Sequence, residues 1–170
     1  MEVFMKTKKL VYSSLLLAIG IILPTLVHLT GIPGNILLPM HLPVLIAGLV
    51  LGPAYGAIIG IILPLINFLL TNMPPIPTLY IMTFELLGYG LFAGIINKKT
   101  NNIILSLIIA MVVGRVFGGI VSYLLFTMLG MSKIPPYIWL SGSVVTGLPG
   151  IIIQLILIPI IAKALMKKLK

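Results

Sequence analysis

The chain has 170 residues, of which 60% are hydrophobic and only 8% are charged. Because soluble domains average about 25% charged residues, this composition excludes a soluble fold and predicts an integral membrane protein made of one compact unit. The formal net charge of +9 does not indicate a nucleic-acid partner, since the lysines gather at the ends of apolar runs, as they do in membrane proteins. The absence of cysteine excludes disulfide and thiolate chemistry.

Six apolar segments are separated by breaks rich in proline, glycine or polar residues. A helix needs about 20 apolar residues to cross the hydrocarbon core, and Gly52-Pro53 marks a turn, because proline disfavours helix in the residue before it. The second segment is short, so we expect a tilted or partly buried helix there. The first is long enough to span and no small-residue cleavage site follows it, so we expect no cleaved signal peptide. The prediction is an all-α bundle in a single transmembrane domain, residues 1–170, with spans near 10–28, 40–51, 54–70, 78–96, 103–129 and 140–165.

The lysines predict how the bundle is oriented. Six spans return the chain to the side on which it starts, and nine of the ten lysines then lie on that side, with Lys133 as the exception. The positive-inside rule makes that side the cytoplasm, so we expect a multi-pass protein with both termini cytoplasmic. The nine are Lys6, Lys8, Lys9, Lys98, Lys99, Lys163, Lys167, Lys168 and Lys170.

The three segments then placed outside the cell, 29–39, 71–77 and 130–139, all contain proline and are rather apolar. This composition is unusual for simple solvated connections and suggests a lid. Irregular backbone at membrane depth persists only where it is buried in protein or lines a cavity. Segment 29–39 is either such a re-entrant piece or an ordinary surface loop, and the sequence leaves both open.

Small residues recur at helical spacing in several spans. Such residues let helix backbones approach closely in lipid. They serve either packing inside the bundle or the binding of a partner, and the sequence does not divide them between the two roles. The groups are Gly52, Gly56 and Gly60; Gly90 and Gly94; Gly114 and Gly118; and Ser14 with Ala18.

Two charged residues lie well inside predicted spans, Glu85 in the fourth and Arg115 near the middle of the fifth. Intramembrane ionisable residues are costly and mark functional sites or partners. Since arginine stays charged, one hypothesis is a Glu85–Arg115 ion pair that locks two helices. The other is that one or both face a substrate cavity, where the planar guanidinium would suit a carboxylate or phosphate.

His41 lies between two prolines at the start of the second span, near the external side. It either caps irregular backbone or points into a ligand cavity. Tyrosine and tryptophan at that level, such as Tyr137 and Trp139, form either an interfacial belt or an aromatic cover that stacks on a flat ligand. Asn35 and Tyr80 lie at the same level, and Asn67, Thr83, Tyr89 and Gln154 lie deeper.

Sequence motifs of catalysis and metal binding are missing. There is no P-loop, no H-E-x-x-H and no G-x-S-x-G sequence. His28 and His41 are too isolated to predict a metal site, and two acidic residues leave little for acid–base chemistry. We therefore expect no enzyme, no catalytic residue, no metal and no ATP hydrolysis by this chain.

Three stretches together resemble a known family: "LLPMHLPVLIAGLVLGPAYGAIIGIILPLINFLL" at 37–70, "NMPPIP" at 72–77 and "FELLGYGLFAGII" at 84–96. They resemble the substrate-binding S components of energy-coupling factor (ECF) vitamin transporters. The resemblance covers about residues 8–97 well, and the later part matches mainly in span pattern. It implies a six-helix bundle in the plasma membrane of a prokaryote, which captures a vitamin or vitamin precursor with high affinity at the external side.

The resemblance also implies a site and partners. The site would be formed by the external segments and helices four to six. A membrane scaffold, the T component, would contact the small-residue faces, and two cytoplasmic ATPases would bind the ATP, so no cofactor is expected on this chain. The substrate would be delivered by toppling of the whole S component in the membrane. Carried onto this chain, the substrate-binding residues are Asn35, His41, Tyr80, Glu85, Tyr89, Arg115, Trp139 and Gln154, and the scaffold face is Ser14, Ala18, Gly56 and Gly60.

The substrate itself stays open. Arg115 suits an acid such as pantothenate or a nicotinate-like ligand. If Glu85 neutralises Arg115, a neutral ligand fits better, such as a pyridoxine-like molecule or a benzimidazole riboside from cobalamin salvage. The alternative function is a structural or assembly subunit of a membrane complex, with no ligand of its own and with polar pairs that only set helix register.

Overall fold

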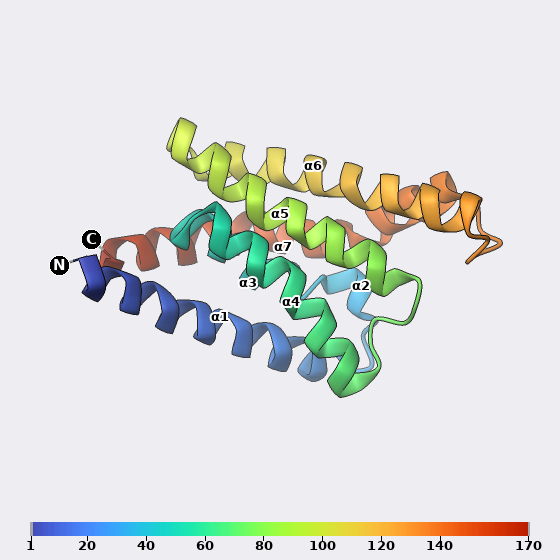
Figure 1. The fold of residues 1–170 in the computed structure, drawn as a ribbon, viewed down its shortest axis with the longest axis horizontal. Coiled ribbons are helices and arrows are strands. Elements are labelled where there is room, and N and C mark those ends of the chain that lie inside the picture. The colour runs from blue at the N-terminus through green and yellow to red at the C-terminus, as the bar shows by residue number, and fades with distance from the viewer. Residues whose placement is uncertain (1, 170) are drawn as a thin grey trace.

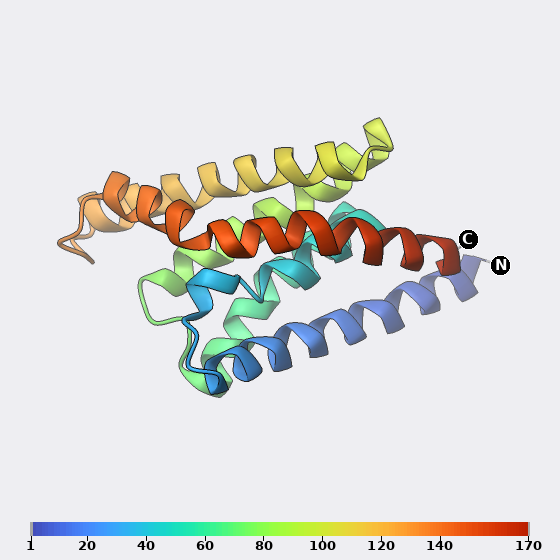
Figure 2. The same cartoon turned by 180° about the vertical axis from the view of Figure 1, so that it is seen from behind.

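The computed structural model describes residues 2–169, so Met1 and Lys170, the last of the C-terminal lysines, lie outside the described residues. All regular structure in the described part is helical (Figures 1 and 2), and six stretches are long and apolar enough to cross a membrane. The predicted all-α fold with six spanning helices is confirmed. The helices are α1 (Glu2–Leu29), the short α2 (Gly34–Leu37), α3 (His41–Leu51), α4 (Pro53–Thr71), α5 (Thr78–Thr100), α6 (Ile103–Tyr123), the π-helical turn η1 (Leu124–Met128) and α7 (Pro136–Leu169).

The turns between helices follow from local sequence. Gly52 has φ 111°, a left-handed value that favours glycine, and α4 begins directly after it with Pro53 in its first turn, where proline fits. Asn72 and Asn101 end α4 and α5 in the left-handed conformation that asparagine tolerates. The Asn102 side chain then accepts a hydrogen bond from the Leu105 N–H and caps α6.

One expected loop is shorter than its predicted bounds. Of the segment 130–139, the last four residues belong to α7, which begins at Pro136. Proline at a helix start loses no hydrogen bond and has a suitable φ, so "PPYIW" begins the helix instead of ending the loop. The consequence is that Trp139 lies on the first turn of a helix.

The two ends of the bundle differ. Figures 1 and 2 show both chain ends, the α3–α4 turn and the α5–α6 turn at one end, which we call the terminal end. The segment between α1 and α3, the 72–77 connection and the 129–135 connection lie at the opposite end, which we call the loop end.

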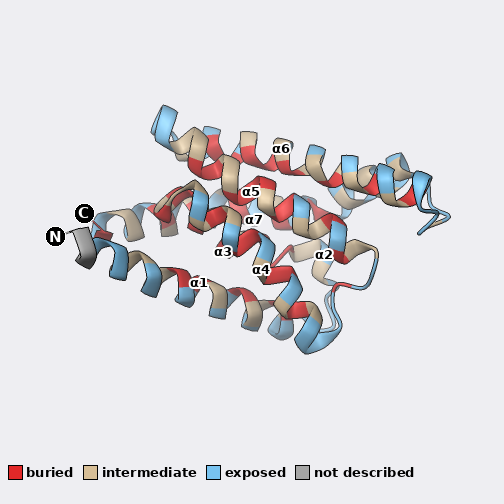
Figure 3. Ribbon diagram, viewed as in Figure 1, coloured by how far each residue is buried: buried red, intermediate tan, exposed pale blue. Residues whose placement is uncertain are grey.

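Helix α3 lies at the centre of the bundle: nine of its eleven residues are buried. Figure 3 shows the buried residues along the inward sides of the helices, with the outward sides exposed. The short second span is therefore a buried helix, which explains why it is apolar on all sides.

Glycines bring α3, α4 and α5 into backbone contact. A Cβ atom added at Gly90 would overlap the carbonyl of Gly56, and one added at Gly60 would overlap the carbonyl of Leu86. Close backbone approach through glycine is a common way for helices to associate in lipid. Gly56 and Gly60 thus pack against α5 inside the bundle.

Candidate ligand-binding site

A cavity of about 710 Å³ lies among the segments of the loop end. This volume lies within the range of small-molecule sites, about 300–1,000 Å³. Its walls combine apolar side chains with a few polar ones. The lining residues are Pro24 and His28 of α1; Pro33, Gly34, Asn35, Leu38, Pro39 and Met40 around α2; His41 of α3; Met73, Pro74 and Pro75; Thr78, Met82 and Glu85 of α5; Arg115 of α6; and Ile134, Ile138, Trp139, Gly142, Ser143 and Thr146 in and before α7.

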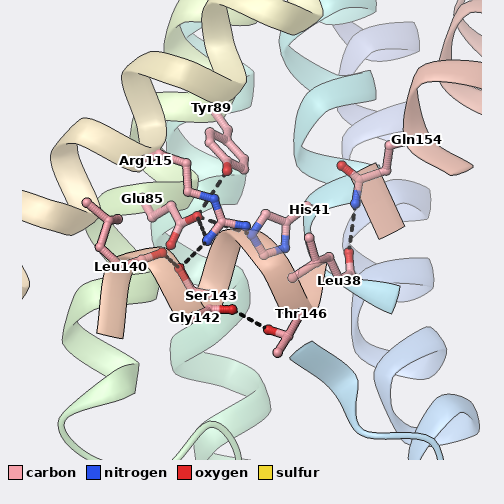
Figure 4. Close-up of polar contacts among 10 residues, drawn as sticks. All are labelled: Leu38, His41, Glu85, Tyr89, Arg115, Leu140, Gly142, Ser143, Thr146 and Gln154. Carbon is pink, nitrogen blue, oxygen red and sulfur yellow. Dashed lines mark hydrogen bonds and ion pairs between the residues drawn. The ribbon is translucent and has the colours of Figure 1, made fainter. Parts of the chain in front are cut away.

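Glu85 is the centre of the polar groups in the cavity wall (Figure 4). Its Oε1 accepts a hydrogen bond from the Tyr89 hydroxyl at 3.0 Å, and Arg115 Nη1 lies 3.1 Å from the same oxygen. His41 Nε2 is 3.7 Å from it, beyond hydrogen-bond distance. The guanidinium also donates from Nη1 to Ser143 Oγ at 3.0 Å. One carboxylate therefore joins α3, α5 and α6, and Arg115 extends the cluster to α7.

Several polar atoms of this cluster are buried without a partner. Glu85 and His41 are each 2% exposed. Both ring nitrogens of His41, and Nε and Nη2 of Arg115, have no hydrogen-bond partner among the described residues. Buried polar groups are normally satisfied, and each exception marks a candidate contact for a molecule that the protein binds.

The local sequence explains how Glu85 is held. Glu85 and Tyr89 are four residues apart and so share one face of α5. Gly114 leaves room for the Tyr89 ring, because a Cβ atom there would overlap it, and Gly118 faces Glu85, with the position of a Cβ 3.2 Å from Oε2. The small-residue pair of α6 thus contributes to the site by admitting a large ring and a carboxylate.

Segment 29–39 turns into the bundle. Leu38 and Pro39 are buried, and Leu38 adopts a left-handed conformation with φ 52°. The Gln154 side chain of α7 donates to the Leu38 carbonyl at 3.2 Å, and a Cβ atom at Gly150 would press on the carbonyls of Ile36 and Leu37. Protein covers residues 38–40, as a re-entrant piece requires, whereas residues 29–33 are exposed, as in a surface loop.

Of the eight residues carried over as substrate-binding, five line the cavity: Asn35, His41, Glu85, Arg115 and Trp139. Tyr89 lies behind Glu85 and contacts it directly. Gln154 holds Leu38 by the hydrogen bond drawn in Figure 4 and does not line the cavity. Tyr80 is 42% exposed and lies outside the wall. The His41 side chain makes no capping hydrogen bond.

The four residues carried over as the scaffold face separate into two pairs. Ser14 and Ala18 are exposed on α1. Gly56 and Gly60 are buried against α5, so they are not on an outward face of the described chain.

Sequence reasoning missed Met82, Ser143 and Thr146 as lining residues. Met82 is three residues before Glu85, and Ser143 is four residues after Trp139, so helical spacing places them beside residues that were recognised. The helical spacing could have predicted these positions, but methionine and serine are common in apolar helices and do not by themselves indicate a binding site.

A family model matches most of the chain. The family model described as "ECF transporter, substrate-specific component" matches residues 8–162. No curated protein and no solved structure matches the chain. The match covers α3 to α6 entirely, most of α1 and α7, and all the residues that form the cavity.

Proposed function

Because the chain belongs to the family of substrate-specific components of ECF transporters, we propose that the cavity at its loop end captures a small vitamin or vitamin precursor. The observation that carries this proposal is the cluster of Glu85, Arg115 and His41 in a cavity wall, where four buried nitrogens have no hydrogen-bond partner among the described residues. The candidate substrates are pantothenate, a nicotinate-like acid, a pyridoxine-like molecule and a benzimidazole riboside.

We place the loop end outside the cell, and both termini in the cytoplasm of a prokaryote. The lysines support this orientation, since those at 6–9, 98–99 and 163–168 all lie at the terminal end. Trp139 lies in the wall near the connections and packs edge to face on Phe126, with ring centroids 6.2 Å apart. We infer that Trp139 covers a flat ligand from the external side.

The family is one of transporter subunits, so the energy for uptake comes from other chains. We propose that this chain associates with a membrane scaffold and two ATPases, and that it carries the cavity inward by toppling. Ser14 and Ala18 offer an exposed small-residue strip on α1 for the scaffold. No enzymatic role is proposed.

The experiment is to co-purify the chain with a scaffold and ATPase module and to measure binding of the four candidate substrates. Binding of one candidate, together with stable association, supports the proposal. Absence of both binding and association contradicts it.

The alternative is an assembly subunit without a ligand, and the Glu85–Arg115 contact between α5 and α6 is the observation that favours it. Replacing both residues at once, by Gln and Met, separates the two functions. A folded variant that has lost ligand uptake supports capture, whereas an unfolded variant of a protein that never binds a ligand supports assembly.

A further inference from the structure

Arg115 uses only one of its three guanidinium nitrogens. Nη1 contacts Glu85 and Ser143, while Nε and Nη2 are buried and have no hydrogen-bond partner among residues 2–169. The Nε–H and one N–H of Nη2 point the same way, and this edge matches the two oxygens of a carboxylate. The ion pair with Glu85 therefore leaves the edge best suited to an acid unused.

Two of the neighbouring acceptor atoms already have partners. Glu85 Oε1 accepts from Tyr89 and faces Arg115. The Ser143 hydroxyl accepts from Arg115 and donates to the Leu140 carbonyl at 2.8 Å. The His41 ring also lacks a hydrogen-bond partner among the described residues and carries at least one N–H in any tautomer. The nitrogens without a hydrogen-bond partner thus include several donors, and a molecule that brings acceptor atoms can satisfy them.

Charge alone does not favour an acid here, because Glu85 already faces Arg115 at 3.1 Å. What favours an acid is geometry, since the Nε–Nη2 edge of Arg115 presents two parallel donors that match the two oxygens of a carboxylate. The other polar groups around Glu85 are His41 and Tyr89, and His28 of α1 lines the same cavity.

Protein encloses the unused edge, since Nε and Nη2 are both buried. On the side of α7 the neighbour is a glycine, because the position of a Cβ on Gly147 would be only 3.4 Å from Nη2. The Arg115 side chain as a whole lines the cavity, so a ligand that binds this edge must displace the groups that cover it.

We propose that the substrate is a water-soluble monocarboxylic acid whose carboxylate binds the Nε–Nη2 edge of Arg115. Its less polar body lies against Met82, Ile138 and Trp139, which line the same cavity. This inference rests on the proposed function and narrows its candidates to the acids.

The test begins with whatever small molecule the protein retains. The wild-type chain is purified in complex with its scaffold and ATPases, and the molecules released on denaturation are identified by mass spectrometry. Recovery of one water-soluble carboxylic acid in stoichiometric amount is the expected result. Recovery of a neutral molecule, or of a membrane lipid as the only acid, overturns the inference and leaves the proposed function in place. Recovery of no small molecule, with no binding of the four candidates, contradicts the proposed function as well.

Arg115→Lys tests the edge itself, since lysine keeps the charge and the contact with Glu85 but lacks the planar pair of donors. We expect its affinity for the recovered acid to fall about 10- to 100-fold, with thermal unfolding and scaffold association unchanged. The matched control is Tyr123→Phe, eight residues further along α6 and 57% exposed, which should bind like the wild type. Equal affinity of Arg115→Lys and the wild type overturns the inference.

Discussion

The two ends of this bundle are built in opposite ways. Toward the terminal end, α3, α4 and α5 pack backbone on backbone, and glycines at 48, 56, 60, 90 and 94 leave no room even for a Cβ atom. At the loop end, α3 and α5 surround a cavity together with α1, α6, α7 and the connecting segments, and buried nitrogens there lack hydrogen-bond partners among the described residues. Close-packed interiors do not adapt their shape, so the glycine contacts supply a fixed base. Unsatisfied groups above that base are available to a ligand.

Breaking the ion pair is expected to have the largest effect. Arg115→Met leaves Glu85 buried without its cation, which should lower the free energy of unfolding by about 3–5 kcal/mol. Glu85→Gln/Arg115→Met removes both charges and should regain most of that loss, because an uncharged pair carries no such penalty. Denaturant unfolding in lipid or detergent measures the free energy of unfolding of the single and the double variant. If the single and the double variant are equally destabilised, the buried unpaired charge of Glu85 is not the cause of the lost stability.

Substitutions at the glycine contacts should be nearly as destabilising. Gly90→Ala places a methyl group on the Gly56 carbonyl, and neither backbone can withdraw from the other. We expect a loss of about 3 kcal/mol, measured by thermal unfolding. The matched control is Gly142→Ala, at a position with no atom within 4 Å of the added Cβ. A Gly90→Ala variant as stable as this control would contradict the close packing of α4 and α5.

Tyr89 connects the two regions, and its loss should have an intermediate effect. Tyr89→Phe keeps the ring that Gly114 admits but removes the hydrogen bond to Glu85. A hydrogen bond to a charged group contributes about 1.5–3 kcal/mol, so stability should fall within that range. Ligand affinity should fall too, because Glu85 loses a group that orients it. Unchanged values of both would assign Tyr89 to packing alone.

Among these substitutions, the replacement of His41 should have the smallest effect on stability. His41→Ala removes a buried ring whose nitrogens have no hydrogen-bond partner, so the destabilisation comes from lost packing and is expected at about 1–2 kcal/mol. Binding of the retained ligand should weaken about tenfold or more, a change of about 1.4 kcal/mol. Calorimetric titration beside thermal unfolding separates the two quantities. A variant that loses stability but keeps its affinity would assign His41 a structural role.

The spans could be predicted because apolar length and Pro/Gly breaks are properties of local sequence. The arrangement of polar residues around α5 could be predicted only in part. Tyr89 is four residues from Glu85 and shares its face, whereas Tyr80 is five residues away on the other side and lies on the exposed surface. Helical spacing alone therefore separates the tyrosine that faces Glu85 from the one that faces outward, although both lie in the same span.

Other features of the site depend on contacts between distant segments. That Gly56 packs on Gly90, and that Gln154 holds Leu38 across 116 positions, is set by how the helices meet. Ser143 joins Arg115 because α7 packs against α6. No periodicity within one helix contains this information.

The most direct test of the account is equilibrium binding of the retained molecule to the wild type and to Glu85→Gln/Arg115→Met. The variant keeps the glycine-packed base and removes both charges from the cavity wall. We expect the folded variant to bind at least about 100-fold more weakly, which corresponds to about 2.7 kcal/mol. A folded double variant that binds as tightly as the wild type would contradict the assignment of this cavity as the substrate site.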